Sequence, residues 1–458
     1  RLISPRNKEY LIVLIIFFII ARLVIGELLL SDGTIGLFHD WYIGPYPEMM
    51  NQYSERGIYS WDSQKGNVPF SVDWIMRVMS IPFGFLGGEG YSKAIIILAS
   101  TLSGFTSYLL SRTLGLKSYV GLLVGAIYIF SPIFFTRVIA GYTYYLIGYA
   151  LAPAILASYL KGYDKGNRKM FLIAGLLMSV AIIQLQFLIM IPIILLVFCI
   201  IRHEEIRVGI IGLGTLLGTC FFITLFPVIL PQIIYPPQID TFSSSEIYGE
   251  LKELPVASQL IESFRMLGYG VHPYSYLNLG SAMDYVNQNK EIIPQWVFYV
   301  DFIIPIAGFS TLLFRRDKYT LSFAIIALIG LFLVKGPNPP FPDFFHKFFS
   351  TGLILFREVW HSIFLYGFAI TFLIGLLLNE FSSKIKQAYS PQTILKYSAI
   401  FSLALLVAIS NGYPLLLGNF AGYAQTFKFP PATKAIYDRY AFNDTFNTLI
   451  LPIFEPIK

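Results

Sequence analysis

The sequence contains little charge and only two cysteines. Asp, Glu, Lys and Arg together make up 13% of its 458 residues, whereas soluble domains carry about 25%. Hydrophobic residues make up 55%, and the mean hydropathy is +0.64. A soluble chain of this length needs polar residues to cover its surface. The composition therefore excludes an ordinary soluble domain and predicts a protein whose solvent is lipid.

Several chemical motifs are also absent. Cys199 and Cys220 fall within apolar runs, lack metal-ligand spacing and are predicted to be core or lipid-facing residues. The sequence has no Walker loop and no nucleophile elbow. Its net charge of +6 comes from short basic clusters between apolar runs, which excludes a nucleic-acid-binding face. Four glycines inside one apolar run favour close helix packing over a nucleotide loop, namely Gly209, Gly212, Gly214 and Gly218.

What is present is a series of apolar runs long enough to cross a membrane. A crossing needs about 20 residues for about 30 Å of hydrocarbon, with some slack from tilt. The stretch 170–201 is either one very long helix or a hairpin that turns at Gln184 and Gln186. Taken as a hairpin, the sequence predicts about eleven transmembrane helices, at 9–30, 92–111, 118–136, 144–160, 170–184, 185–201, 207–229, 296–314, 319–335, 361–379 and 396–417.

The basic residues between these runs favour the hairpin. With the N-terminus inside, the hairpin places about half of all Lys and Arg in short cytoplasmic loops. A single helix at 170–201 would export the later clusters and violate the positive-inside rule. The clusters are Arg1/Arg6/Lys8, Arg112/Lys117, Lys161/Lys165/Arg168/Lys169, Arg202/Arg207, Arg315/Arg316/Lys318 and Lys384/Lys386/Lys396.

The same parity places the long connecting segments outside. The stretch Val72 to Gly87 is apolar but contains Asp73 and Arg77, so we expect an amphipathic helix on the outer interface. A second amphipathic stretch is predicted from Glu246 to Leu267. The outer segments are 31–91, 230–295, 336–360 and a tail from 418.

All five tryptophans fall in these outer segments or at their membrane edges, which indicates either an interfacial belt or the walls of a ligand groove. In the tail, Leu449 to Ile453 has the pattern of a strand, with no partner evident. We therefore expect one transmembrane domain at 1–417, and an outer tail at 418–458 that begins a further soluble domain.

The first outer segment carries the strongest candidate for chemistry. Asp40 follows the first helix between His39 and Trp41, and Trp61-Asp62 lies further along. A carboxylate of ordinary pKa is ionised at neutral pH and can accept a proton from an attacking hydroxyl. The indole rings could stack on the apolar face of a sugar. The alternative is that Asp40 caps a helix or turn in a solvated loop.

A second candidate segment is Phe356 to His361, at the outer mouth of the tenth helix. Arg357 offers a forked donor suited to a phosphate, and His361 could add another. The alternative is an interfacial Arg357–Glu358 pair with Trp360 as a membrane anchor. A third segment, from Arg137 to Tyr145, is a Tyr-rich outer turn that could supply a further cation toward the same phosphate.

These segments resemble the GT-C glycosyltransferases, and among them the membrane part of the mycobacterial arabinofuranosyltransferase-D family. The resemblance covers most of the chain in order. Ser362 follows His361 where that family has a basic residue. The matching elements are Asp40, Trp61-Asp62 with Gly66-Asn67, Tyr128 to Pro132 with Arg137, Gly148 to Pro153, and Phe356 to His361.

The resemblance implies an all-α polytopic membrane protein with a GT-C-like bundle and outer-face amphipathic helices. It implies a transferase that moves arabinofuranose or another sugar from a polyprenyl-phosphate donor to a cell-envelope glycan or glycolipid, with inversion. Asp40 would be the general base, and Arg137, Arg357 and His361 would bind the donor phosphate. The sugar and acceptor would contact His39, Trp41, Trp61, Asp62, Tyr144, Glu358 and Trp360.

The resemblance also bears on the setting of the enzyme. Some members of the superfamily use a divalent metal, but this sequence offers no clear ligand set and no certain cofactor. The expected location is the plasma membrane, with the N-terminus in the cytoplasm and the active site and tail outside.

Two other functions remain open. A transporter or flippase of lipid-linked saccharides should carry ionisable residues near the bilayer midplane and interrupted helices in corresponding halves. The predicted helices are nearly free of charge at their centres, which favours the transferase. A non-catalytic scaffold for envelope assembly is the third alternative.

Overall fold

The computed structural model is an all-α polytopic membrane protein with one small two-stranded sheet. It describes residues 5–36, 46–48, 50–51, 75, 78, 80–234, 260–266, 295–336, 338–344, 359–387, 392, 395, 398, 402, 413–420, 425–428 and 430–440.

Ten of the predicted spans correspond to single helices or to two or three consecutive helices. Within the described residues, five helical stretches are long and apolar enough to cross a membrane, and three shorter apolar helices accompany them. The helices of the bundle are α1 (Pro5–Val24), α5 (Gly87–Thr113), α6 (Ser118–Ile129), α7 (Pro132–Ile139), α8 (Thr143–Lys165), α9 (Arg168–Ala181), α10 (Phe187–Ile201), α11 (Ile206–Cys220), the π-helical turn η3 (Phe221–Leu225), α12 (Phe226–Ile234), α16 (Gln295–Phe314), α17 (Lys318–Val334) and α19 (Ile363–Gln387).

The predicted hairpin at 170–201 is confirmed. Helix α9 ends at Ala181 and α10 begins at Phe187, and Gln184 donates a hydrogen bond to Gln186 in the turn at 2.7 Å. Asp164, before α9, accepts a hydrogen bond from Arg202, after α10, at 2.5 Å. The chain therefore returns through α10 to the end of the bundle that it left through α9.

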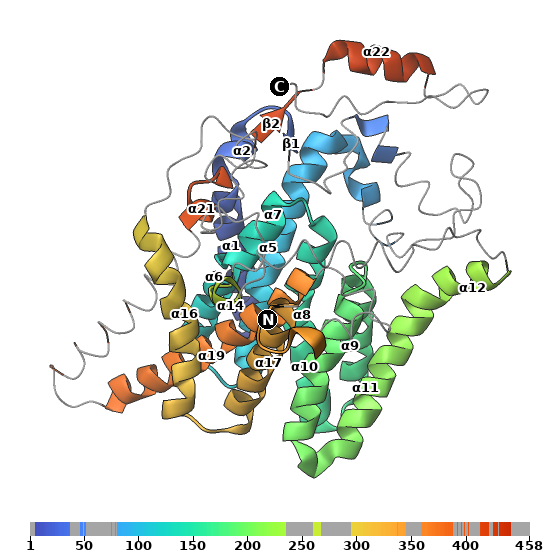
Figure 1. Ribbon diagram of the computed structural model, residues 1–458. Coiled ribbons are helices and arrows are strands. Elements are labelled where there is room, and N and C mark those ends of the chain that lie inside the picture. The colour runs from blue at the N-terminus through green and yellow to red at the C-terminus, as the bar shows by residue number, and fades with distance from the viewer. Residues whose placement is uncertain are drawn as a thin grey trace.

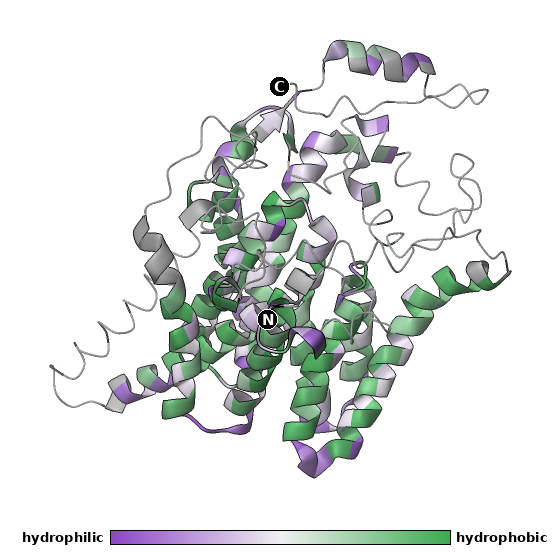
Figure 2. Ribbon diagram, viewed as in Figure 1, coloured by the Kyte–Doolittle hydropathy of each residue, from purple (hydrophilic) through white to green (hydrophobic). Residues whose placement is uncertain are grey.

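Burial separates a central helix from a peripheral one. In the apolar window of α19, 89% of residues are buried inside the protein, whereas in the stretch that contains α11 and α12 only 22% are. The exposed side chains of α11 and α12 are large and apolar, as expected for a surface that faces lipid. Hydrophobic residues fill the middle of the bundle and hydrophilic residues collect at its two ends (Figure 2).

Short elements connect the first and last parts of the chain at one end of the bundle (Figure 1). Strand β1 (Thr34–Gly36) pairs antiparallel with β2 (Gln425–Phe427), with Ile35 opposite Thr426. The remaining elements there and in the loops are α2 (Gly26–Leu30), η1 (Ile81–Leu86), η2 (His203–Glu205), α14 (Leu260–Phe264), η5 (Val359–Ser362), α21 (Tyr413–Leu416) and α22 (Pro431–Tyr440).

The glycines of α11 divide into two kinds. A Cβ added at Gly212 would collide with the Phe171 ring of α9, and one at Gly209 would collide with Cys199 of α10. Among the residues that the structure describes, none lies within 4 Å of such an atom at Gly214 or Gly218. Close packing is therefore confirmed for the first two glycines and wrong for the last two, because no described helix of the bundle packs against those two positions.

Some predictions concern residues outside the described part. These are the strand at Leu449 to Ile453, most of the span 396–417 and, in the amphipathic stretch from Val72 to Gly87, the residues before Ser80 other than Ile75 and Val78. At the end of the latter, η1 leads directly into α5, so the chain enters that span from a short helical turn.

Candidate active site

The segment Tyr128 to Pro132 fixes the start of α7. The Ser131 hydroxyl accepts a hydrogen bond from the Phe134 N–H at 3.1 Å, and Pro132 occupies the first helical position. Tyr128 and Tyr149 stack with ring centroids 4.0 Å apart. Each of the two hydroxyls donates to the other residue's backbone carbonyl, at 2.9 and 2.8 Å. This local structure determines where α7 places Arg137, in the last turn of the helix.

Arg137 is held on aromatic rings. Arg137 is buried, with only 2% of its surface exposed. The guanidinium carbon lies 5.5 Å from the ring centroid of Tyr142 and 5.0 Å from that of Tyr145. Both distances are within the range of a cation–π interaction. Because Tyr142 precedes α8 and Tyr145 lies in its first turn, the sharp connection between α7 and α8 orients the cation.

His361, from a distant part of the sequence, contacts the same two tyrosine rings. It lies in η5, immediately before α19, and is fully buried. Its ring centroid is 5.2 Å from those of both Tyr142 and Tyr145. The Tyr145 hydroxyl donates to the His361 carbonyl at 2.8 Å. Two of the three residues predicted to bind the donor phosphate therefore share one pair of tyrosines.

This cluster has the chemistry of an anion site. A guanidinium presents a planar fork of donors, and an imidazole presents one or two more. Within the part of the chain that the structure describes, no Asp or Glu is buried, whereas Lys93, Arg137, Arg265, Lys335 and His361 are. Ionisable side chains at membrane depth are costly and usually functional.

Arg265 and Lys335 were not predicted as site residues. Arg265 follows α14 and its guanidinium carbon lies 5.5 Å from the Phe302 ring centroid. Ile133 of α7 and Met266 both lie against Gly367 of α19, which connects this segment to the helix that carries Arg137. The amphipathic pattern of Glu246 to Leu267 was the only signal in the sequence, and it does not show where the segment docks.

Lys335 ends α17, which packs against η5. Its ammonium donates to the carbonyls of Gly336 and Asn338 at 3.2 and 2.8 Å and lies 4.8 Å from the Phe332 ring centroid. In the sequence Lys335 resembles the other lysines at the ends of predicted spans, so no pattern predicted that it is buried.

The other predicted site residues are distributed as follows. Tyr144 lies in the first turn of α8 and is partly buried against the core. For Trp360 only the backbone is described, within η5. Outside the described residues lie His39, Asp40, Trp41, Trp61, Asp62, Arg357 and Glu358.

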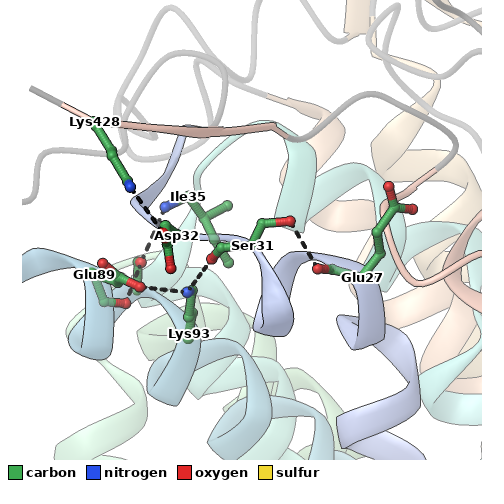
Figure 3. Close-up of polar contacts among 8 residues, drawn as sticks. Glu27, Ser31, Asp32, Ile35, Glu89, Lys93 and Lys428 are labelled. Atoms are coloured by element: carbon green, nitrogen blue, oxygen red, sulfur yellow. Dashed lines mark hydrogen bonds and ion pairs between the residues drawn. The ribbon is translucent and has the colours of Figure 1, made fainter.

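The entry to the segment that carries Asp40 is nevertheless well defined (Figure 3). Strand β1 ends at Gly36, four residues before Asp40 in the sequence. On one side, the Lys93 ammonium of α5 donates to the Ser31 carbonyl at 2.7 Å and to Glu89 at 2.8 Å. The Ile35 N–H also donates to Ser92 of α5, at 3.3 Å.

The tail holds the other side of this segment. Lys428 and Asp32 form an exposed ion pair at 2.9 Å, drawn in Figure 3. The hydrogen bond from Lys428 and its charge lower the pKa of Asp32 below its ordinary value. Asn419 donates to Glu27 at 2.6 Å, and the Glu27 N–H donates to the Gly418 carbonyl at 3.2 Å.

No group of three or more His, Cys, Asp or Glu side chains that could hold a metal ion occurs among the described residues. Since Asp40 and Asp62 lie outside them, the metal dependence raised by the resemblance stays untested.

Solved structures provide the comparison. The cryo-EM structure of arabinofuranosyltransferase AftD from Mycobacteria matches with a TM-score of 0.57 and 12% identity, over 91% of this chain and 27% of that one. The archaeal oligosaccharyltransferase AglB from Archaeoglobus fulgidus, in complex with an inhibitory peptide and a dolichol-phosphate, matches with a TM-score of 0.52 and 14% identity, over 95% of this chain and 59% of that one.

The chain therefore spans about a quarter to three fifths of the length of these two proteins and shares the fold of the parts that it matches. No protein-family model matches it, and no curated protein matches it by sequence.

Proposed function

We propose that this protein is a membrane glycosyltransferase that takes its sugar from a polyprenyl-phosphate donor and transfers it, with inversion, to a cell-envelope glycan. The observation that carries the proposal is the shared tyrosine pair, on which Arg137 and His361 lie at 5.0–5.5 Å. Both similar structures are those of glycosyl-transferring enzymes, and one of them contains a dolichol-phosphate.

In this proposal the Arg137–His361 cluster binds the phosphate that becomes the leaving group. Negative charge grows on that phosphate as the glycosidic bond breaks, so buried, pre-oriented donors stabilise the transition state more than the ground state. Aromatic packing fixes Arg137 before the donor arrives, which reduces the ordering cost of binding. Arg357 is proposed to add a second guanidinium.

Asp40 is proposed as the general base. It would accept the proton of the acceptor hydroxyl while that oxygen attacks the anomeric carbon. The support for this role is the start of its segment, which is tied to α5 through Ser31 and Ile35 and to the tail through β2. The sugar and acceptor contacts are proposed for His39, Trp41, Trp61, Asp62, Tyr144, Glu358 and Trp360.

The test is transfer by the reconstituted full chain from a radiolabelled polyprenyl-phosphoryl arabinofuranose, followed by other polyprenyl-phosphoryl sugars. Asp40→Asn should bind the donor but lose transfer by about 100-fold or more. Arg137→Gln should raise the donor KM about tenfold or more, since a hydrogen bond to a charged group contributes about 1.5–3 kcal/mol. Arg112→Gln, at the other end of the bundle beside Glu9, is the matched control and should leave the donor KM unchanged.

Transfer by Asp40→Asn at the wild-type rate would overturn the base assignment. The competing flippase function predicts instead that wild-type protein moves the labelled donor across liposomes without any acceptor. It also predicts that Asp40→Asn moves the donor equally well.

A further inference from the structure

A second polar site lies at the end of the bundle opposite the Arg137–His361 cluster. It is a cavity of about 250 Å³ lined by Arg202, Asp317, Lys318 and Tyr319. Helix α8 connects the two ends, since Tyr145 contacts His361 and Tyr163 contacts Arg202. The separation of 18 positions between these tyrosines corresponds to a rise of about 27 Å, close to the thickness of the hydrocarbon core. The cavity therefore opens at the other membrane interface.

Arg202 is fixed in this cavity by three contacts. Its Nη2 donates to Asp164 at 2.5 Å, and its guanidinium carbon lies 4.7 Å from the Tyr163 ring centroid and 5.8 Å from that of Tyr319. Its Nη1 is buried and makes no hydrogen bond within the part of the chain that the structure describes. A rigid guanidinium with an unused donor is suited to bind an oxyanion.

The carboxylate in the cavity wall is already occupied. One Asp317 oxygen accepts from the N–H and hydroxyl of Thr320, at 2.8 and 2.9 Å, and the other accepts from Arg315 at 2.5 Å. Because Asp317 caps α17, Lys318 and Tyr319 lie in the first turn of this helix. The backbone N–H groups of a first turn point out of the helix and favour a nearby negative charge.

Lys318 provides a second cation at the rim. Its ammonium contacts Glu204 at 2.8 Å, with side-chain exposures of 47% and 68%. Ion pairs this exposed contribute little, so Lys318 can turn toward a ligand at low cost. Arg202, Lys318 and the α17 N-terminus therefore converge on one cavity from two helices, α10 and α17.

The two helices beside the cavity also carry exposed apolar side chains. Leu196 and Ile200, in the last turns of α10, are 46% and 54% exposed, and Leu321, in the first turn of α17, is 46% exposed. An anion held at Arg202 would thus lie near exposed apolar side chains on both helices that line the cavity. A ligand that combines a phosphate with acyl chains matches both features, whereas free phosphate matches only the first.

We propose that this cavity binds the phosphate of an anionic phospholipid from the leaflet at that end of the bundle, with Arg202 and Lys318 as its ligands. The acyl chains lie along Leu196, Ile200 and Leu321. The site is separate from the proposed sugar-transfer site, and its occupancy holds together the loops that follow α8, α10 and α16. Lipid binding therefore stabilises the folded bundle by mass action.

The test is the thermal unfolding midpoint of the full chain in maltoside micelles, titrated with dioleoylphosphatidylglycerol, dioleoylphosphatidylcholine or inorganic phosphate. We expect phosphatidylglycerol to raise the midpoint by several degrees, and the other two additions to raise it by less than half as much. Arg202→Gln and Lys318→Gln should each lose at least half of the phosphatidylglycerol shift, measured from their own lipid-free midpoints.

Lys384→Gln is the matched control, because Lys384 is a partly exposed, ion-paired lysine near the same end that does not line the cavity. Its shift should equal that of wild type. If Arg202→Gln does not fold, Lys318→Gln decides alone. Equal shifts in wild type and Lys318→Gln, or an equal shift with phosphatidylcholine, would overturn the site. An equal shift with inorganic phosphate would overturn the lipid as its ligand.

Discussion

Tyr145 and His361, 216 residues apart, are joined by a hydrogen bond of 2.8 Å from the tyrosine hydroxyl to the histidine carbonyl. The same tyrosine ring lies under the Arg137 guanidinium. One side chain therefore holds the start of α8, the turn before α19 and the end of α7 in a fixed relation. Any ligand that contacts both Arg137 and His361 depends on this joint.

The first prediction removes only the hydroxyl of that joint. Tyr145→Phe keeps the ring but leaves the His361 carbonyl without this donor, so it should destabilise the fold by about 1–2 kcal/mol. Since η5 can then shift relative to Arg137, the transfer rate should also fall. Thermal unfolding and transfer kinetics measure the two effects.

Tyr159→Phe is the matched control on the same helix. Its buried hydroxyl donates to the Gly209 carbonyl at 2.9 Å, far from the cluster. It should cost similar stability and leave transfer at saturating donor unchanged. If both variants lose transfer equally, the effect of Tyr145 is general destabilisation and not alignment of the cluster.

The sequence predicted the course of the chain better than its contacts. Each long apolar run must cross the membrane, so the Lys and Arg residues of the short loops indicate which loops are cytoplasmic. Counting these residues on each side was enough to predict the hairpin at Gln184. Arg137 and His361 could be predicted as site residues because each is a basic residue beside aromatic residues at the end of a predicted span. Their shared tyrosines could not, since α8 and η5 are brought together only by the packing of α19.

Three further features show the same limit. Strand β1 has three residues, and its partner β2 lies almost 400 positions away, so no local pattern marks the pair. Arg265 and Lys335 are buried only because distant segments cover them. Gly212 and Gly214 look alike in the sequence, and only the position of α9 distinguishes them.

The second prediction concerns that pair of glycines. Gly212→Ala should destabilise the bundle, because the new Cβ collides with the Phe171 ring and α11 must move away from α9. Gly214→Ala has open space and should be neutral or slightly stabilising, since alanine favours a helix by up to about 1 kcal/mol over glycine. Thermal unfolding of both variants in one detergent checks this, and equal midpoints would contradict the packing.

The third prediction concerns the pH range of the Asp32–Lys428 contact between the first outer segment and the tail. The pKa of Asp32 is lowered and that of Lys428 is raised by their mutual hydrogen bond and charge. The Asp32 contribution is therefore present above its unfolded pKa of about 3.9 and is lost as pH falls through the lower folded value. The Lys428 contribution is present below about 10.4 and is lost as pH rises through the higher folded value.

A pair of nitroxide labels at Leu30 and Ala432, both on exposed positions, reports this contact as a distance distribution. The distribution should be narrow between about pH 5 and 9 and broaden as the pH falls below the unfolded Asp pKa of about 3.9. Lys428→Gln should broaden it at neutral pH, and high salt should do the same in wild type only. A wild-type distribution that is independent of pH and salt would mean that the β1–β2 pairing alone holds the tail.

The fourth prediction tests the sidedness on which the proposed site depends. The basic loops at Asp164, Arg202 and Lys318 meet at one end of the bundle, and the positive-inside rule assigns that end to the cytoplasm. The β1–β2 pair lies at the other end, beside the start of α5. Cysteines at Lys165 and Ala432, both exposed, therefore fall on opposite sides.

The natural cysteines need not be removed for this measurement, because Cys199 and Cys220 are at most 1% exposed. In intact cells an impermeant maleimide should label Ala432→Cys at once and Lys165→Cys only after permeabilisation. The unmodified chain should stay unlabelled in both conditions. Labelling of Lys165→Cys from outside would invert the bundle. It would place Arg137 and His361 on the cytoplasmic face, where a donor presented from the outer leaflet could not reach them.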